Sequence, residues 1–318
     1  MKMQNKKLLK PGLLLLLFGA LMAAFLLPLR IWQQIYLVEP DSGFWVASNH
    51  NTVTMLYVAM GALIVIPTIA AIFTRKKMVL DIDRRPRVVE GFFALMVGAA
   101  ILASVAVALH FAFSIFSGQM IVEGVRPIEG QMMQYYIRSG VMAALLEALF
   151  GVGAALFFGN LGIINLFPDK KLYLNRLLLL MPALWVVARL LRRFSRTIAY
   201  LRVSDLFITL AALVLLMIFF LAFAQTLGGI NNKNRVWRLV ATGVPAAILL
   251  LLTFVPRMVA YDIIGGVAVP PDALREITDP TIALFLCVFL FSRLRCKTSE
   301  ETVLEQTENQ PEEQAETP

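Results

Sequence analysis

A glutamate and a histidine are the side chains best placed to do chemistry, because both lie inside long apolar runs. Glu147 lies six residues into the run 141–167, and His110 lies about six residues before the end of the run 91–116. An ionisable side chain is costly to place in lipid, so within such a run it marks a functional candidate. A carboxylate and an imidazole at low dielectric can relay protons, because burial and charged neighbours tune their pKa values.

Two arginines near the ends of other runs extend this candidate site. If the chain has eight spans, Arg189 and Arg257 share the predicted depth of the glutamate and the histidine, near the outer side of the membrane. We therefore predict a polar cavity lined by Glu147, His110, Arg257 and Arg189, with Glu276 and Asp279 as further candidates and a Glu147–Arg257 pair as its test. If the chain has seven spans, Arg257 moves to the inner side and cannot pair with Glu147. The simpler alternative is that Glu147 makes an ion pair or a hydrogen bond that fixes helix packing, while His110 and Arg257 extend toward the membrane interface.

Small residues at helical spacing flank both candidate residues. Glu147 shares an i, i+4 stripe with Gly151, Ala155 and Gly159. His110 follows Ala99, Ala103 and Ala106 on one face, and a neighbouring face carries Ala100, Ser104, Ala108 and Ala112. Small residues let membrane helices approach closely, so the runs 91–116 and 141–167 are expected to pack tightly together.

A basic segment follows the fifth apolar run. Residues 189–202 read RLLRRFSRTIAYLR, in which cations alternate with apolar residues at near-helical spacing. This pattern predicts a basic amphipathic helix on the membrane surface, carried by Arg192, Arg193, Arg196 and Arg202. Such a helix contacts lipid phosphates, or an anionic ligand if it folds over the cavity.

These side chains must be positioned by transmembrane helices. A span needs about 20 apolar residues, and continuous rather than alternating apolar runs favour helices over strands. The runs predict an all-α polytopic helical bundle with short loops and eight spans, at about 11–29, 52–73, 91–116, 141–167, 172–191, 206–227, 239–260 and 277–294. The fifth and eighth runs are the weakest, because their uninterrupted apolar cores are short, and seven spans remain an alternative.

The distribution of Lys and Arg predicts the orientation. Four Lys precede the first run, and the positive-inside rule places this end in the cytoplasm for either span count. The basic segment 189–202 offends the rule in the eight-span arrangement, so the charges do not separate eight spans from seven. We predict a multi-pass protein of the plasma membrane with a cytoplasmic N-terminus.

Composition excludes a soluble enzyme, a nucleic-acid-binding protein and a secreted domain. Of the 318 residues, 59% are hydrophobic and 16% are charged, whereas soluble domains average about 45–50% and about 25%. The net charge of +8 comes from cations that flank apolar runs, which argues for membrane topology over nucleic-acid binding. Residues 1–296 are predicted to form one membrane domain, and residues 297–318, with seven Glu and one Lys, a disordered acidic tail.

The sequence leaves two function classes open. It contains no Walker A motif, no H-E-x-x-H and no G-x-S-x-G, and its two His and two Cys fit no zinc spacing, so no cofactor or metal is predicted. The favoured class is a non-enzymatic membrane protein, either a small-solute transporter or an accessory subunit that contacts other membrane subunits and the lipid bilayer. The alternative is an intramembrane enzyme acting on a lipid-linked substrate, with Glu147 and His110 as its acid–base pair.

Overall fold

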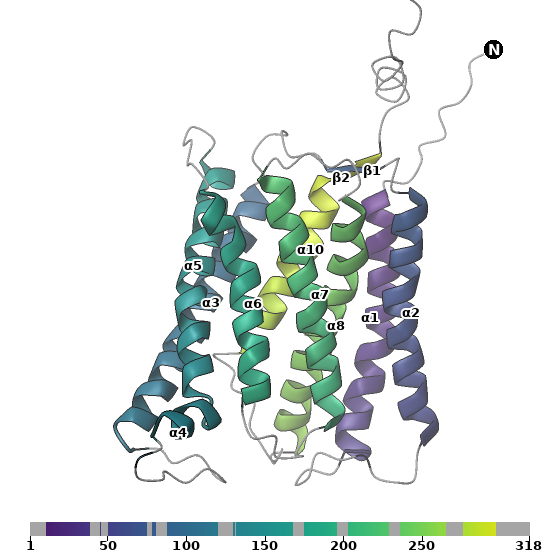
Figure 1. The fold of residues 1–318 in the computed structure, drawn as a ribbon. Helices are drawn as coiled ribbons and strands as arrows, with labels where there is room; N and C mark the ends of the chain where they lie inside the picture. The colour runs from purple at the N-terminus through teal and green to yellow at the C-terminus, as the bar shows by residue number, and fades with distance from the viewer. Residues whose placement is uncertain are drawn as a thin grey trace, which may run out of the picture.

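The chain folds into a bundle of long helices that run side by side (Figure 1). The computed structural model describes residues 11–38, 45, 50–74, 78–80, 88–119, 130, 132–167, 175–195, 203–228, 236–264 and 276–296. Its elements are α1 (Pro11–Tyr36), α2 (His50–Thr74), β1 (Met78–Leu80), α3 (Val88–Phe116), α4 (Met132–Arg138), α5 (Val141–Leu166), α6 (Arg176–Ser195), α7 (Val203–Leu227), α8 (Val236–Ile264), α10 (Thr278–Arg293) and β2 (Leu294–Cys296). The predicted fold class, an all-α membrane bundle, is confirmed.

Six helices, and not the predicted eight, are long and apolar enough to cross a membrane in the described part of the chain. They are Leu17–Tyr36, Asn51–Thr74, Val88–Phe116, Val141–Leu166, Asp205–Leu227 and Val236–Ile263. The protein is therefore a multi-pass membrane protein, and its spans contact the lipid bilayer. The tail predicted for residues 297–318 lies outside the described residues.

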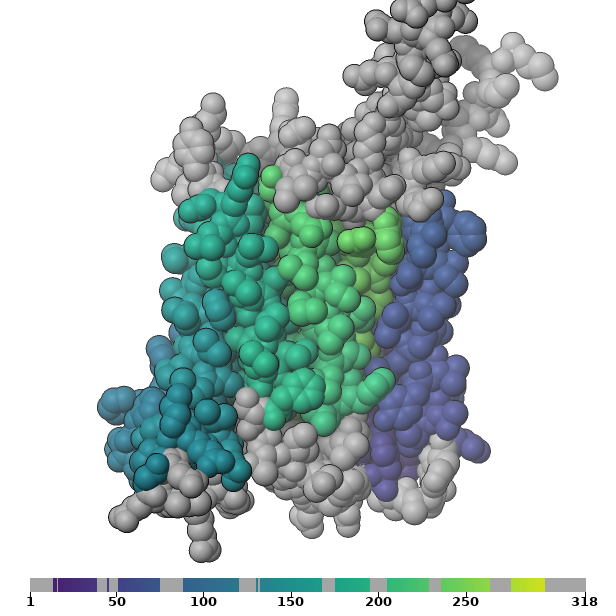
Figure 2. Space-filling view, viewed as in Figure 1, coloured from purple at the N-terminus to yellow at the C-terminus, as the bar shows by residue number. Residues whose placement is uncertain are grey.

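The two remaining predicted spans correspond to α6 and α10, and each fails for a physical reason. α6 carries four arginines in 20 residues, which lowers its hydropathy. α10 has 16 residues, which at 1.5 Å per residue extend about 24 Å, short of a hydrocarbon core of about 30 Å. Both helices still pack inside the bundle, α6 against α5 and α7 and α10 against α8 and α3. Figure 2 shows α6 and α7 packed side by side on one face.

Prolines do not break the helices in which they lie. The sequence offers Pro67, Pro182 and Pro245 as candidate breaks, yet α2, α6 and α8 continue through them. The interruption lies elsewhere, because α10 begins partway along the bundle and does not reach the end that α7 and α8 reach (Figure 1). A helix end therefore lies within the bundle at Thr278.

Glycines bring α3 and α5 into backbone contact, and the two runs pack tightly as predicted, although Gly91 and Gly162 lie outside the predicted stripes. A Cβ on Gly91 would lie 2.9 Å from the carbonyl oxygen of Gly162, and a Cβ on Gly162 would lie 2.9 Å from that of Gly91. A Cβ on Gly151 would lie 2.5 Å from Val105. Only glycine fits at such contacts, so these positions fix how closely the two helices approach.

Phenylalanines fill the interior between the two ends of the bundle. The phenylalanine cluster comprises Phe157, Phe158, Phe219, Phe220, Phe223, Phe285 and Phe289, all buried. Most of its ring pairs pack edge to face, with centroids 4.9 Å apart for Phe223 and Phe289 and 5.3 Å apart for Phe158 and Phe285. Two pairs, Phe219 with Phe223 and Phe285 with Phe289, are stacked. Because the cluster joins α5, α7 and α10, it leaves an apolar layer between whatever polar groups lie at either end.

Two short strands tie the last helix to an early loop. β1 and β2 pair antiparallel, with Val79 opposite Arg295. The end of α2, the start of α3 and the end of α10 therefore share one end of the bundle, here called the sheet end (Figure 1). The opposite end, where α1 ends and α7 begins, is called the far end.

Candidate functional site

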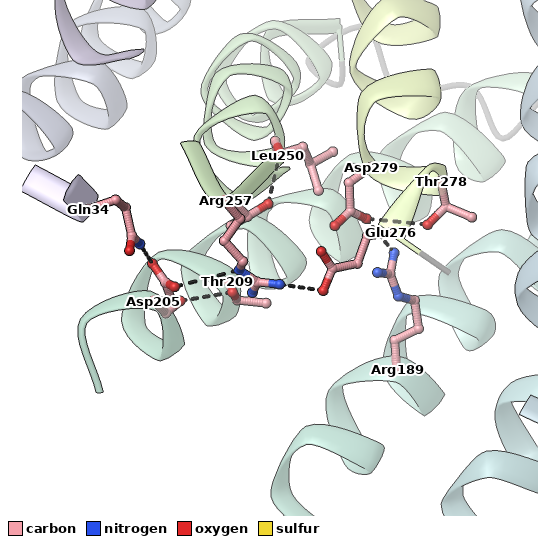
Figure 3. A network of polar contacts seen from close by, with 10 residues as sticks. Gln34, Arg189, Asp205, Thr209, Leu250, Arg257, Glu276, Thr278 and Asp279 are labelled. Carbon is pink, nitrogen blue, oxygen red and sulfur yellow. Dashed lines mark hydrogen bonds and ion pairs between the residues drawn. The ribbon is translucent and has the colours of Figure 1, made fainter. Parts of the chain in front are cut away.

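Charged side chains from six helices meet in the half of the bundle nearer the far end. We call this group the charged network, and its ion-paired members are Arg30, Glu147, Arg189, Arg192, Asp205, Arg257, Glu276 and Asp279. All are buried except Glu276, which is partly buried. Figure 3 shows the part of the network that runs from α1 to α6.

Asp205, in the first turn of α7, is the hub of one arm. Arg30 of α1 ion-pairs with its Oδ1, and Gln34, one turn further along α1, donates to the same oxygen at 2.9 Å. The guanidinium of Arg30 also lies over the ring of Trp45, 4.9 Å from its centroid. Because this arginine has no exposed surface, the carboxylate and the aromatic ring offset part of the cost of removing its charge from water.

Arg257 carries the network across to α10. Its Nε lies 3.6 Å from Asp205 Oδ2, and its Nη1 donates to Glu276 Oε1. The side chain thus reaches between two carboxylates, Asp205 on α7 and Glu276, which lies two residues before α10 begins (Figure 3). One arginine therefore links α8 to two neighbouring elements.

Arg189 of α6 completes this arm from the other side. Its Nη1 donates to Asp279 Oδ1 at 2.8 Å, and its guanidinium lies 5.1 Å from the centroid of the Trp185 ring, one turn earlier on α6. Asp279 occupies the first turn of α10, where the positive end of the helix dipole also favours a carboxylate. The beginning of α10 therefore contacts an arginine on each side, Arg257 of α8 through Glu276 and Arg189 of α6 through Asp279.

Glu147 and Arg192 form a second arm between α5 and α6. Arg192 Nη1 donates to Glu147 Oε2 at 2.8 Å, and the two side chains expose only 3% and 1% of their surface. The same guanidinium lies 5.1 Å from the centroid of Phe111 on α3. Such a pair is strongly coupled, because little water screens it.

A second group of polar side chains lies at the sheet end. In this Arg293 cluster, Arg293 Nε and Nη2 donate to the two oxygens of Glu90 at 2.7 and 3.2 Å. Its Nη2 also donates to Asn165 Oδ1 at 2.9 Å, and Ser292 Oγ donates to Glu90 Oε2 at 3.1 Å. The two-pronged geometry is the strong form of an arginine–carboxylate contact. α10 therefore ends, as it begins, in buried ionic contacts.

The structure brings together most of the residues that the sequence predicted for a polar cavity. Arg189, Arg257, Glu147, Glu276 and Asp279 all belong to the charged network. The partners differ from the prediction, because Glu147 pairs with Arg192 and Arg257 pairs with Glu276, in place of a Glu147–Arg257 pair.

His110 stands apart from the network. Its side chain is exposed on the outside of α3. Of the two small-residue faces of this helix, the bundle buries Ala100, Ser104, Ala108 and Ala112, so the face that leads to His110 points outward. His110 and Glu147 therefore do not face a common enclosed site.

The basic segment is only partly described, and its first part is not a surface helix. Arg192, predicted to face the membrane surface, is buried against Glu147, because α6 continues to Ser195 and turns this side chain into the bundle. Arg193 is partly buried. Arg196 and Arg202 lie outside the described residues.

Sequence reasoning missed Arg30, Gln34 and Asp205, because they fall at the edges of the apolar runs. The first run ends at residue 29, yet α1 continues to Tyr36, and Asp205 precedes the sixth run although α7 begins at Val203. Arg30, Gln33 and Gln34 share one helical face at i, i+3 and i+4 spacing. That polar stripe was the available signal.

The described residues contain no group of three or more His, Cys, Asp or Glu side chains able to hold a metal ion. No protein-family model, curated protein or solved structure matches the chain.

Proposed function

We propose that this protein is a non-enzymatic transporter of a small solute, in which the charged network and the Arg293 cluster close opposite ends of one pathway. The observation that carries the proposal is the position of α10. Glu276 and Asp279 at its beginning belong to the charged network, Ser292 and Arg293 at its end belong to the Arg293 cluster, and Phe285 and Phe289 lie between them.

The cost of burying these charges supports this role. Ionisable residues within membrane bundles are rare, and they mark pathways for ions and substrates. Replacing a buried ion pair by apolar residues is often neutral or stabilising, so packing alone gives little reason to keep several. Ion pairs can, however, break and re-form at alternate ends as a pathway opens to one side and then to the other.

α10 is the natural moving element of such a cycle. Discontinuous helices with ends inside the bundle are typical of transporter binding sites. α10 spans about 24 Å and begins within the bundle, so a modest tilt would loosen one ionic cluster while the other stays closed. The apolar layer at Phe285 and Phe289 keeps the two ends from opening together.

The enzyme alternative has less support. It requires Glu147 and His110 to act as an acid–base pair, but His110 is exposed on the outside of α3 and Glu147 is held by Arg192. An accessory subunit would need the ionic clusters only to fix packing, and the experiment below separates that role from transport.

We also propose a plasma-membrane location with the N-terminus and the sheet end in the cytoplasm. The basic residues before α1 and between α2 and α3 support this orientation through the positive-inside rule. The pairing of β1 with β2 supports placing the end of α10 on the same side, which disfavours the seven-span alternative. Reporter fusions after residue 80 and after residue 296 are expected to give the same cytoplasmic signal, and opposite signals would refute this orientation.

The transporter role is tested by single cysteines at the two ends, in a Cys287→Ser, Cys296→Ser background. Thr209→Cys reports on the far end, and Thr242→Cys reports on the sheet end. The two sites are well matched, because both threonines are buried and both hydroxyls donate to a carbonyl of their own helix. Thr242 precedes Gly243, whose position contacts Leu290 one turn before Arg293.

Variants that break one cluster should change the two labelling rates in opposite directions. Glu90→Gln should raise labelling of Cys at 242 and lower labelling at 209 several-fold, and Glu276→Gln should do the reverse. Labelling that rises at both positions in each variant would mean that the clusters only hold the bundle together. That result would favour the accessory-subunit role. It would refute a transport pathway that opens to one side of the membrane and then to the other.

A further inference from the structure

Arg193 is the one buried or partly buried charged side chain near the network that lacks a partner among the described residues. It lies on α6 one turn after Arg189, is partly buried, and makes no hydrogen bond or ion pair in the described part of the chain. It lies within electrostatic range of Arg257, Arg189, Glu276 and Asp279. Two of these groups repel it and two are carboxylates already engaged by other arginines.

Arg193 leaves this part of the bundle with an excess of positive charge. Of the described side chains that are buried or partly buried here, the cations are Arg30, Arg189, Arg192, Arg193 and Arg257, and the anions are Glu147, Asp205, Glu276 and Asp279. The excess is one positive charge if every group is ionised. An uncompensated charge at low dielectric is costly, so a mobile anion at this place would stabilise the bundle.

Arg257, within electrostatic range of Arg193, has a donor that makes no hydrogen bond. Its side chain is 5% exposed, and its buried Nε faces Asp205 Oδ2 at 3.6 Å, an ion pair that is too long to be a hydrogen bond. The adjoining beginning of α10 contributes the positive end of a helix dipole. Arginine forks match the geometry of carboxylate and phosphate groups, which accept two parallel hydrogen bonds.

We propose that Arg193 and Arg257, beside the beginning of α10, bind a small oxyanion, a carboxylate or a phosphate group, and that this group belongs to the transported solute. The assignment of this group to the transported solute rests on the transporter role proposed above, whereas the binding site itself does not. Glu276, the most exposed carboxylate of the network, holds Arg257 when no anion is bound, and it competes with the incoming group.

The test is anion-dependent stability of the purified full-length chain in a neutral detergent. The midpoint of thermal unfolding is followed against sodium phosphate and, separately, sodium acetate, at constant ionic strength maintained with sodium chloride. The site predicts a saturable rise of the midpoint with at least one of these anions. Arg193→Gln should raise the apparent Kd at least tenfold, and Glu276→Gln should lower it, because it removes the competing carboxylate.

Matched arginines provide the controls. Arg176→Gln changes an exposed arginine at the other end of α6, and Arg138→Gln changes an exposed one on α4 at the far end. Both should leave the apparent Kd unchanged. Should Arg193→Gln fold poorly, Arg193→Lys keeps the charge but loses the fork, and it should weaken binding by a smaller factor.

A parallel measurement identifies the source of the anion. Mixed micelles with phosphatidylglycerol are compared with mixed micelles containing phosphatidylcholine. An Arg193-dependent rise with phosphate or acetate supports a soluble ligand, and a rise that depends on Arg193 only with phosphatidylglycerol supports a lipid headgroup. The oxyanion site is overturned if no probe gives a saturable rise, or if Arg193→Gln responds as the unchanged protein does.

The binding experiment tests the oxyanion site and the labelling experiment tests the transporter role, so either proposal can be refuted without the other. Arg193-dependent binding without opposite labelling changes would keep the oxyanion site and remove the transporter role. Opposite labelling changes without anion binding would keep the transporter role and remove the site.

Discussion

The buried pair between Glu147 and Arg192 gives the most quantitative prediction. The two side chains are almost fully buried, and Nη1 lies 2.8 Å from Oε2. With charge centres about 4 Å apart and an effective dielectric of about 20, their attraction is about 4 kcal/mol. Removing one member of a buried pair usually costs about 3–5 kcal/mol, because the remaining charge stays buried.

A double-mutant cycle measures this coupling. Glu147→Gln and Arg192→Gln should each lower the free energy of unfolding by about 3–5 kcal/mol. Arg192→Gln should cost up to about 1 kcal/mol more, because it also loses its contact with the Phe111 ring. The double variant should cost about as much as one single variant, because neither charge is then left alone.

The assay is reversible unfolding in mixed detergent micelles, with all four proteins measured under one condition. Arg176→Gln is the control, since this exposed arginine lies at the opposite end of α6 and should change stability by less than about 0.5 kcal/mol. Single variants that cost less than about 1 kcal/mol, or a double variant that costs the sum of the two, would refute the claim of a desolvated, coupled pair.

Three further predictions concern packing, the sheet end and the exposed histidine. Gly162→Ala should destabilise the protein by about 1–3 kcal/mol in the same unfolding assay, because the new methyl meets the Gly91 carbonyl oxygen at 2.9 Å. Gly159→Ala is the control, because its methyl enters open space and should leave stability unchanged or slightly raise it. Equal effects of the two variants would contradict the close contact. Arg293→Gln should lower the free energy of unfolding by about 3–5 kcal/mol, because it leaves the buried Glu90 carboxylate without its charged partner. The exposed Arg238 is the control and should tolerate the same change. A mild effect of Arg293→Gln would mean that water screens the cluster. His110→Ala should change stability by less than about 0.5 kcal/mol and leave cysteine labelling unchanged, and a loss of labelling alternation in this variant would return His110 to the site.

Hydrophobic runs predicted the helices well but not which of them qualify as spans. The runs at 172–191 and 277–294 were the weakest in the sequence, and these are the two helices that fall short, α6 through its arginines and α10 through its length. Their place inside the bundle depends on partners such as Asp279 for Arg189. Long-range pairing of this kind has no local sequence signal.

Candidate site residues could be chosen from burial cost, but their partners could not. Glu147, Arg189 and Arg257 stood out because each interrupts an apolar run, and all three belong to the charged network. His110 met the same criterion and lies outside, because α3 has two small-residue faces and only packing decides which one is buried. Asp205 was overlooked because a charge at the edge of a run resembles an ordinary flanking residue.

The most direct test of the central claim is a distance measurement between spin labels at the two ends of α10. With Cys287 and Cys296 replaced by Ser, one pair joins exposed positions 291 and 73 at the sheet end. Another pair joins exposed position 277, just before α10, with exposed position 133 on α4 at the far end. Glu90→Gln should lengthen the first distance and leave the second short, and Arg257→Gln should do the opposite. Distances that stay fixed at both ends, or broaden together in both variants, would contradict a pathway closed alternately by the two ionic clusters.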